Sequence, residues 1–209
     1  MQNSMYIFKK DDGINKFYKN DQPLLTPMGR PVTTAFDALA KRLKEHLNKY
    51  GEDPGDPVSI VAFHYAMIDF FAVMPREELE DNIRIGLSRE EDWTFSCPSA
   101  APEMMMNWLG LFGRCDDRVT EASEWLSTLS PLQLCAVCVI GKAMESVNIP
   151  YIVAHLEKKH LKAFAKEVNK LYPYVPTNDL TKFFENLHFY FTVEHTDTGP
   201  VARATKQVK

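Results

Sequence analysis

The chain has 209 residues, 45% of them hydrophobic, and its 24 basic and 28 acidic residues give a formal net charge of -4. This length can bury a full core as one domain, and the absence of a long basic tract argues against a surface that follows nucleic-acid phosphates. The longest apolar run, residues 134–140, is too short to span a bilayer, and the first ten residues lack a secretory signal. We therefore expect a cytoplasmic protein that binds neither nucleic acid nor membrane.

The N-terminal part is rich in residues that favour turns. Asp11-Asp12-Gly13 and the stretch from Asn20 to Pro23 are examples, so residues 1–34 are expected to form an irregular segment. Only Met5 to Phe8 has a composition that could form a short strand. From residue 35 onward, apolar residues recur every three or four positions, which predicts helices over residues 35–50, 58–73 and 75–87. The second of these is apolar except for His64 and Asp69.

Helical periodicity continues through the second half of the chain. Helices are predicted over residues 103–112 and 118–129, followed by a long helix from Ser130 to about His155, which Pro150 would bend. A last helix is expected from Thr177 to about His195, followed by a flexible tail over residues 199–209. No repeat or linker divides this region, so the expected fold is all-α, with one helical bundle over residues 35–198.

Two of the four cysteines have the spacing of half a zinc site or of a redox pair. They are Cys135 and Cys138, within an apolar run, while Cys97 and Cys115 stand apart. No second pair is present to complete a tetrahedral site. Small thiols that fill a packed helix explain the pair better.

Residues with metal-binding chemistry occur on the last two predicted long helices. His188 and His195 are seven residues apart, so they leave one helix face about 10 Å apart along the axis, with Thr192 between them. Glu145 is a lone acid in an apolar stretch. Carboxylate and imidazole together suit iron or manganese, but Glu145 could instead hydrogen-bond a histidine or a backbone carbonyl without any metal.

Three stretches together resemble the haem-oxygenase-like metal oxidases, the group that includes CADD-like proteins and relatives of TenA. They are residues 132–150, the Leu-Tyr-Pro at 171–173, and residues 183–195. The resemblance implies a single-domain all-α bundle of about seven helices that uses iron to oxidise a small organic substrate. It further implies that Glu145, His188 and His195 are metal ligands and catalytic residues, and that Tyr151, Phe184, Phe191 and Thr192 line the substrate cavity.

The chain departs from that family in two places. Thr192 stands where the family has an aspartate, and no histidine lies between His64 and His155 to complete the ligands expected in the first half. One iron, two irons or a site that has lost its metal are therefore the alternatives. The corresponding functions are a non-haem iron oxidase or oxygenase and a degenerate relative of one.

An alternative resemblance points to a non-catalytic protein. Residues 22–31, followed by a helix, together with residues 108–113 and 129–134, are similar to segments of the ATP synthase alpha-subunit assembly chaperones. That family has a β-rich first domain, whereas residues 1–34 are expected to be too few to build one. Neither resemblance decides between a monomer and a homodimer.

Overall fold

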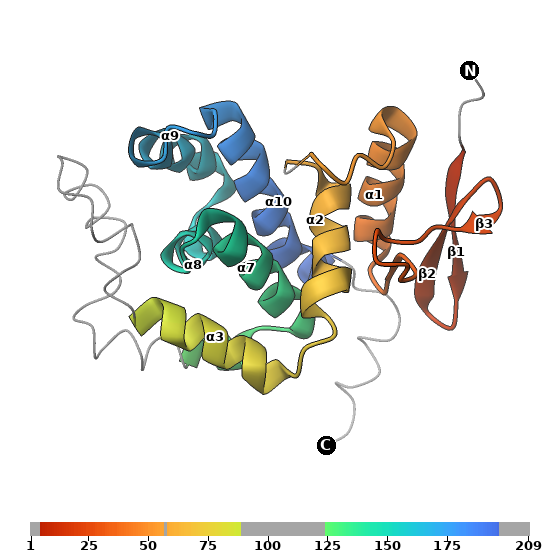
Figure 1. Cartoon of the computed structure of the whole chain (residues 1–209), viewed down its shortest axis with the longest axis horizontal. Coiled ribbons are helices and arrows are strands. Elements are labelled where there is room, and N and C mark those ends of the chain that lie inside the picture. Colours follow the sequence, from red (N-terminus) through yellow and green to blue (C-terminus); the bar gives the residue numbers. More distant parts are fainter. Residues whose placement is uncertain (1–4, 57, 89–123, 197–209) are drawn as a thin grey trace. The chain divides into compact units, whose positions relative to one another are not determined.

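The computed structural model describes residues 5–56, 58–88 and 124–196, and it contains strands as well as helices (Figure 1). The predicted all-α fold is therefore wrong. The segment expected to be irregular forms a four-stranded antiparallel sheet. Its strands are β1 (Tyr6–Asp11), β2 (Ile14–Lys19), β3 (Gln22–Pro23) and β4 (Thr33–Thr34).

The sheet is built around the hairpin of β1 and β2. Asp12 and Gly13 connect the two strands with φ angles of 48° and 80°, the left-handed conformations of a two-residue type I′ turn. Across the strands Phe8 faces Phe17, and their ring centroids are 5.7 Å apart. Strand β2 is central, because it pairs with β1 on one side and with both β3 and β4 on the other.

Two helices and a π-helical turn follow the sheet: α1 (Asp37–Tyr50), α2 (Ile60–Ala66) and η1 (Met67–Phe71). The helix predicted over residues 35–50 is confirmed by α1, which buries the stripe Leu39, Leu43 and Leu47. Ser59 caps α2 by accepting hydrogen bonds from the amides of Val61 and Ala62.

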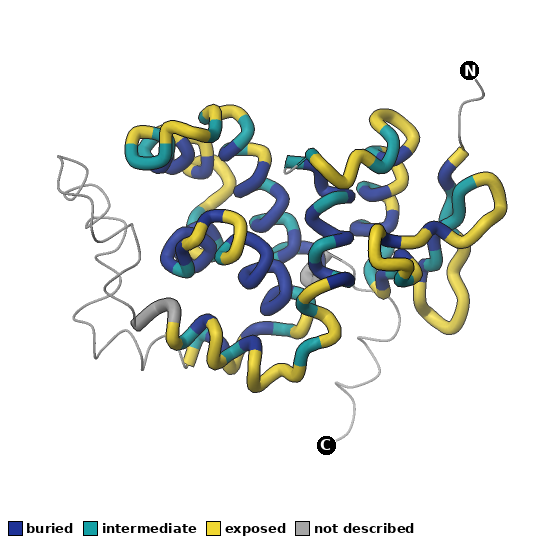
Figure 2. Tube along the Cα trace, viewed as in Figure 1, coloured by how far each residue is buried: buried dark blue, intermediate teal, exposed yellow. Residues whose placement is uncertain are grey.

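The remaining described helices are α3 (Arg76–Ser88), residues 124–128, α7 (Pro131–Met144), α8 (Asn148–His155), η3 (Lys158–His160), α9 (Leu161–Leu171) and α10 (Thr177–Thr196). Helix α7 begins with a capping box, in which Ser130 and Gln133 exchange hydrogen bonds between side chain and backbone. Most of α7 is buried (Figure 2). None of the helices that these described residues form is long and apolar enough to cross a bilayer.

The long bent helix predicted from Ser130 is wrong, because the chain breaks after Met144. Glu145 adopts a left-handed conformation, with φ 50° and ψ 32°, and ends α7. Pro150 then lies in the first turn of α8. A proline fits there without loss, because amides of the first turn have no partner within the helix.

The chain divides into two compact units. The first unit contains residues 5–69 and 189–196, and the second contains residues 70–88 and 124–188. The predicted helix at 103–112, most of the one at 118–129, and Cys97 and Cys115 lie outside the described residues.

Candidate functional site

The residues predicted to hold a metal lie at the end of α7 and on α10. Glu145 is exposed at the end of α7, and His188 is half-buried on α10. Burial lowers the pKa of His188, and the positive charge of Lys158 lowers it further, while a hydrogen bond with the backbone of Leu156 opposes both effects. The lysine charge also disfavours a cation at this imidazole.

Thr192 and His195 complete the predicted set on α10. The Thr192 hydroxyl donates to the carbonyl oxygen of Phe189 at 3.1 Å, a bond back to the preceding turn. The backbone of His195 belongs to α10, but its side chain lies outside the described part of the chain. The described residues contain no group of three or more His, Cys, Asp or Glu side chains that could hold a metal ion. The iron site of Glu145, His188 and His195 stays a prediction.

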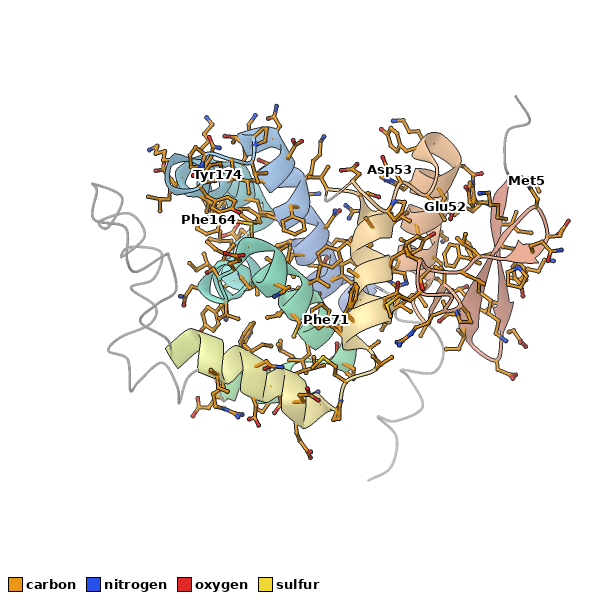
Figure 3. The ribbon with its side chains drawn as sticks, in the orientation of Figure 1. Met5, Glu52, Asp53, Phe71, Phe164 and Tyr174 are labelled. Carbon is orange, nitrogen blue, oxygen red and sulfur yellow. The ribbon has the colours of Figure 1, made fainter. Side chains whose placement is uncertain are left out.

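The aromatic residues predicted to line a cavity make packing contacts. In the second unit, the buried Tyr151 meets Trp125 edge-on, at 4.6 Å between ring centroids. Phe184 is fully buried and packs at 5.5 Å against Phe164, which Figure 3 labels. Phe191 belongs to the first unit and is partly exposed. The structure therefore gives Tyr151 and Phe184 a role in the core of the second unit.

The thiols of α7 match the structural interpretation of the sequence. Cys135 and Cys138 are both buried and free. Burial raises the pKa of the Cys135 thiol to about 11 and that of Cys138 to about 12. Thiols that remain protonated are poor nucleophiles and poor metal ligands, so both side chains act as small core residues.

A second hairpin lies between β3 and β4. The amide of Thr26 donates to the carbonyl of Arg30 at 2.8 Å, and the amide of Gly29 donates to the carbonyl of Thr26 at 2.8 Å. Gly29 has φ 77°, which closes the loop as a turn followed by a left-handed residue. The side chains of Leu25 and Met28 are 46% and 56% exposed, so this hairpin presents two large apolar groups to solvent.

A buried carboxylate fixes the hairpin to the helical part of the first unit. Asp69, on η1, is 4% exposed and accepts hydrogen bonds from the Thr26 hydroxyl and, at 3.3 Å, from the amide of Met28. Arg30 adds a bond from its guanidinium to the carbonyl of Ile68 at 3.1 Å. Charge-assisted bonds to a buried acid are among the strongest that proteins make. The backbone beneath Leu25 and Met28 is therefore held in one conformation.

A second set of buried polar contacts involves His64 on α2. The side chain of His64 is buried. Its Nε2 donates to the carbonyl of Thr33 at 3.0 Å, and its Nδ1 accepts from the Tyr190 hydroxyl at 3.1 Å. Burial lowers its pKa to about 4, so the ring is neutral at pH 7. Both nitrogens are engaged, which leaves none for a substrate.

Sequence reasoning missed both hairpins of the first unit, although each has a local signal in the sequence. For the β1–β2 hairpin, the signal is the Asp12-Gly13 pair between stretches of strand-forming residues. The Thr26 to Arg30 stretch contains proline and glycine in the order of a tight turn. No protein-family model, curated protein or solved structure matches the chain.

Proposed function

We propose that this chain is a non-catalytic protein-binding factor, similar to the ATP synthase alpha-subunit assembly chaperones. The observation that carries the proposal is the hairpin of residues 24–31, which exposes Leu25 and Met28 on a backbone fixed by Asp69. Apolar side chains on a preorganised loop bind a partner with less loss of entropy than those on a loose one. Methionine adapts its shape to the surface it meets.

The small sheet supports the same proposal. Residues 22–31 belong to the segments that resemble those chaperones, and that family carries a β-rich first domain. From the sequence, residues 1–34 were expected to be too few to build such a domain. Residues within this segment do form a four-stranded antiparallel sheet, which supports the proposal. The partner proposed on this basis is the ATP synthase alpha subunit, in a form that has not yet joined its complex.

Co-expression with the ATP synthase alpha subunit tests the proposal. We expect the two chains to elute together in size-exclusion chromatography with light scattering, and to do so in the presence of a metal chelator. Apolar contacts need no metal, so the chelator leaves the complex intact. An alpha subunit that elutes alone, or that is equally soluble without this chain, would contradict the proposal.

Metal analysis after iron loading tests the iron-oxidase hypothesis separately. Protein loaded anaerobically with ferrous iron should retain stoichiometric metal if His188 and His195 are ligands. The double variant His188→Ala/His195→Ala should then lose it, because each removed imidazole is a lost ligand. Absence of metal in the wild type, or equal metal in the variant, would remove the hypothesis.

A further inference from the structure

The outer edge of β1 carries backbone groups that face away from the sheet. Among the described strands, β1 is the end strand of the sheet and pairs with β2 alone. The amide of Asn20 donates to the carbonyl of Met5 at 3.2 Å. This hydrogen bond shows that the backbone of Met5 faces β2, and it therefore determines which residues of β1 face away from β2. In an antiparallel pair, every second residue turns its N–H and C=O away from the partner strand. In β1 these residues are Tyr6, Phe8 and Lys10.

At one end of this edge, a side chain of the protein already occupies the outward-facing backbone groups. Asn48, on α1, accepts a hydrogen bond from the Tyr6 amide at 3.1 Å and donates one to the Tyr6 carbonyl at 2.9 Å. Its carboxamide thus occupies the place that a peptide group of a neighbouring strand would take. Within the described ranges, no residue makes a hydrogen bond to the backbone of Phe8 or Lys10. The edge is closed at Tyr6 and open at the next two outward-facing residues.

Helix α1 places lysine side chains beside the open part of the edge. Residues 37, 41, 44 and 48 form one helical stripe, which runs antiparallel to β1. Lys10 pairs with Asp37 at 2.7 Å, and the Lys44 ammonium lies 5.9 Å from the ring centroid of Phe8. Lys41 lies close enough to Asp37 to help lower the pKa of that carboxyl, to which the hydrogen bond from Lys10 contributes most. Three lysines thus adjoin the open edge, with one carboxylate on the stripe.

This charge selects among the strands that could add to the edge. Lysine on an edge strand is a common means of preventing unwanted pairing. A second copy of this chain, paired antiparallel about Lys9, would place like charges opposite one another, which is destabilising. A strand with glutamate or aspartate at alternate positions would instead meet Lys10, Lys41 and Lys44 with opposite charge.

We propose that the open edge of β1, from Phe8 to Lys10, binds an extended acidic segment of a partner protein, which adds as a strand beside β1. Main-chain hydrogen bonds to Phe8 and Lys10 give the register, and the lysines of β1 and α1 give the preference for acidic residues. This site is separate from the hairpin of residues 24–31, and it does not depend on the proposed function.

The test uses the full chain and a capped heptapeptide of alternating glutamate and valine. We expect the peptide to bind and to protect the amides of Phe8 and Lys10 from hydrogen exchange. The same peptide with lysine in place of glutamate should bind at least about tenfold more weakly, because it meets like charge. No binding at peptide concentrations up to about 1 mM, equal binding of both peptides, or protection elsewhere in the chain would overturn the proposal.

Two variants at one position separate the backbone contact from the charge. Lys10→Gln keeps the outward N–H, whereas Lys10→Pro removes it, and both lose the exposed pair with Asp37. Proline is tolerated on an edge strand where its missing N–H would face outward. We expect Lys10→Pro to lose binding and Lys10→Gln to weaken it only partly, with melting temperatures that show both variants folded. Equal peptide affinity of the two folded variants would contradict strand addition.

A further pair of variants keeps this proposal distinct from the chaperone proposal. Leu25→Ser/Met28→Ser alters the hairpin and should leave the affinity for the acidic peptide unchanged. Lys41→Glu/Lys44→Glu should reduce that affinity at least about tenfold by reversing the charge beside the edge. Loss of peptide binding in the hairpin variant, or its retention in the charge-reversed one, would overturn the assignment to β1.

Discussion

Asp69 and Glu145 are both lone acids in apolar stretches of the sequence, but they differ in burial and in hydrogen bonding. Asp69 is buried and accepts hydrogen bonds from Thr26 and Met28. Glu145 is exposed in a left-handed turn that ends α7. An acid enters the interior only where the chain brings donors to it, and the donors for Asp69 come from a loop about forty residues earlier. The spacing around an acid on its own helix does not reveal such donors.

Removing the two carboxylates in turn tests this contrast most strongly. We expect Asp69→Ala to lower the free energy of unfolding by about 3 kcal/mol, because it leaves the Thr26 hydroxyl and the Met28 amide without their acceptor. Glu145→Ala is the matched control and should change it by less than about 0.5 kcal/mol. Urea denaturation measures both values. Comparable losses in the two variants would show that Asp69 has no special structural role.

The buried histidine of α2 makes the stability of the first unit depend on pH. The folded protein lowers the pKa of His64 from 6.5 to about 4, so the unfolded chain binds a proton more readily. The contribution of a neutral His64 is therefore present above pH 6.5 and is lost as the pH falls toward 4. Between these values the free energy of unfolding should fall by up to about 1.4 kcal/mol per pH unit.

His64→Gln is the control for this pH dependence. Burial also lowers the pKa of His46 and His188, so only the difference in slope between wild type and variant belongs to His64. Urea titrations at a series of pH values measure it. Identical slopes would mean that His64 is protonated equally in the folded and unfolded states, against the burial seen here.

Glu145→Gly sharpens the comparison from the other side. A φ of 50° at Glu145 strains the backbone because glutamate has a Cβ, whereas glycine adopts that conformation without strain. We expect the variant to be more stable by about 1 kcal/mol, measured as a higher urea midpoint. A loss of stability would imply that the glutamate side chain makes contacts that outweigh the strain.

The helices with strong periodicity could be predicted from sequence. Helix α1 could be predicted from the spacing of Leu39, Leu43 and Leu47, because residues at this spacing lie on one helix face, and that face is buried. The β1–β2 hairpin could have been predicted from Asp12-Gly13, but β3 and β4 could not, since they are two residues long and form by pairing with β2. The break at Glu145 was missed because the apolar residues of α7 and α8 form one continuous pattern, in which Pro150 fits either a bend or a first turn.

The candidate hairpin depends even more on tertiary contacts. The resemblance of residues 22–31 to a chaperone segment was visible in the sequence, but their anchoring to Asp69 and Ile68 required the fold. The same holds for the edge of β1, where Asn48 comes from a helix more than forty residues away. Contacts at such separation leave no local pattern, so a sequence indicates the residue types without their partners.

The most direct measurement of the central claim is the affinity of the ATP synthase alpha subunit for hairpin variants. Leu25→Ser/Met28→Ser should weaken binding by about tenfold or more, because it removes two exposed apolar groups. The melting temperature should change little. Tyr174→Ser is the control, since Tyr174, which Figure 3 labels, is 84% exposed in the second unit. Unchanged affinity in the hairpin variant, or an equal loss in Tyr174→Ser, would contradict the account.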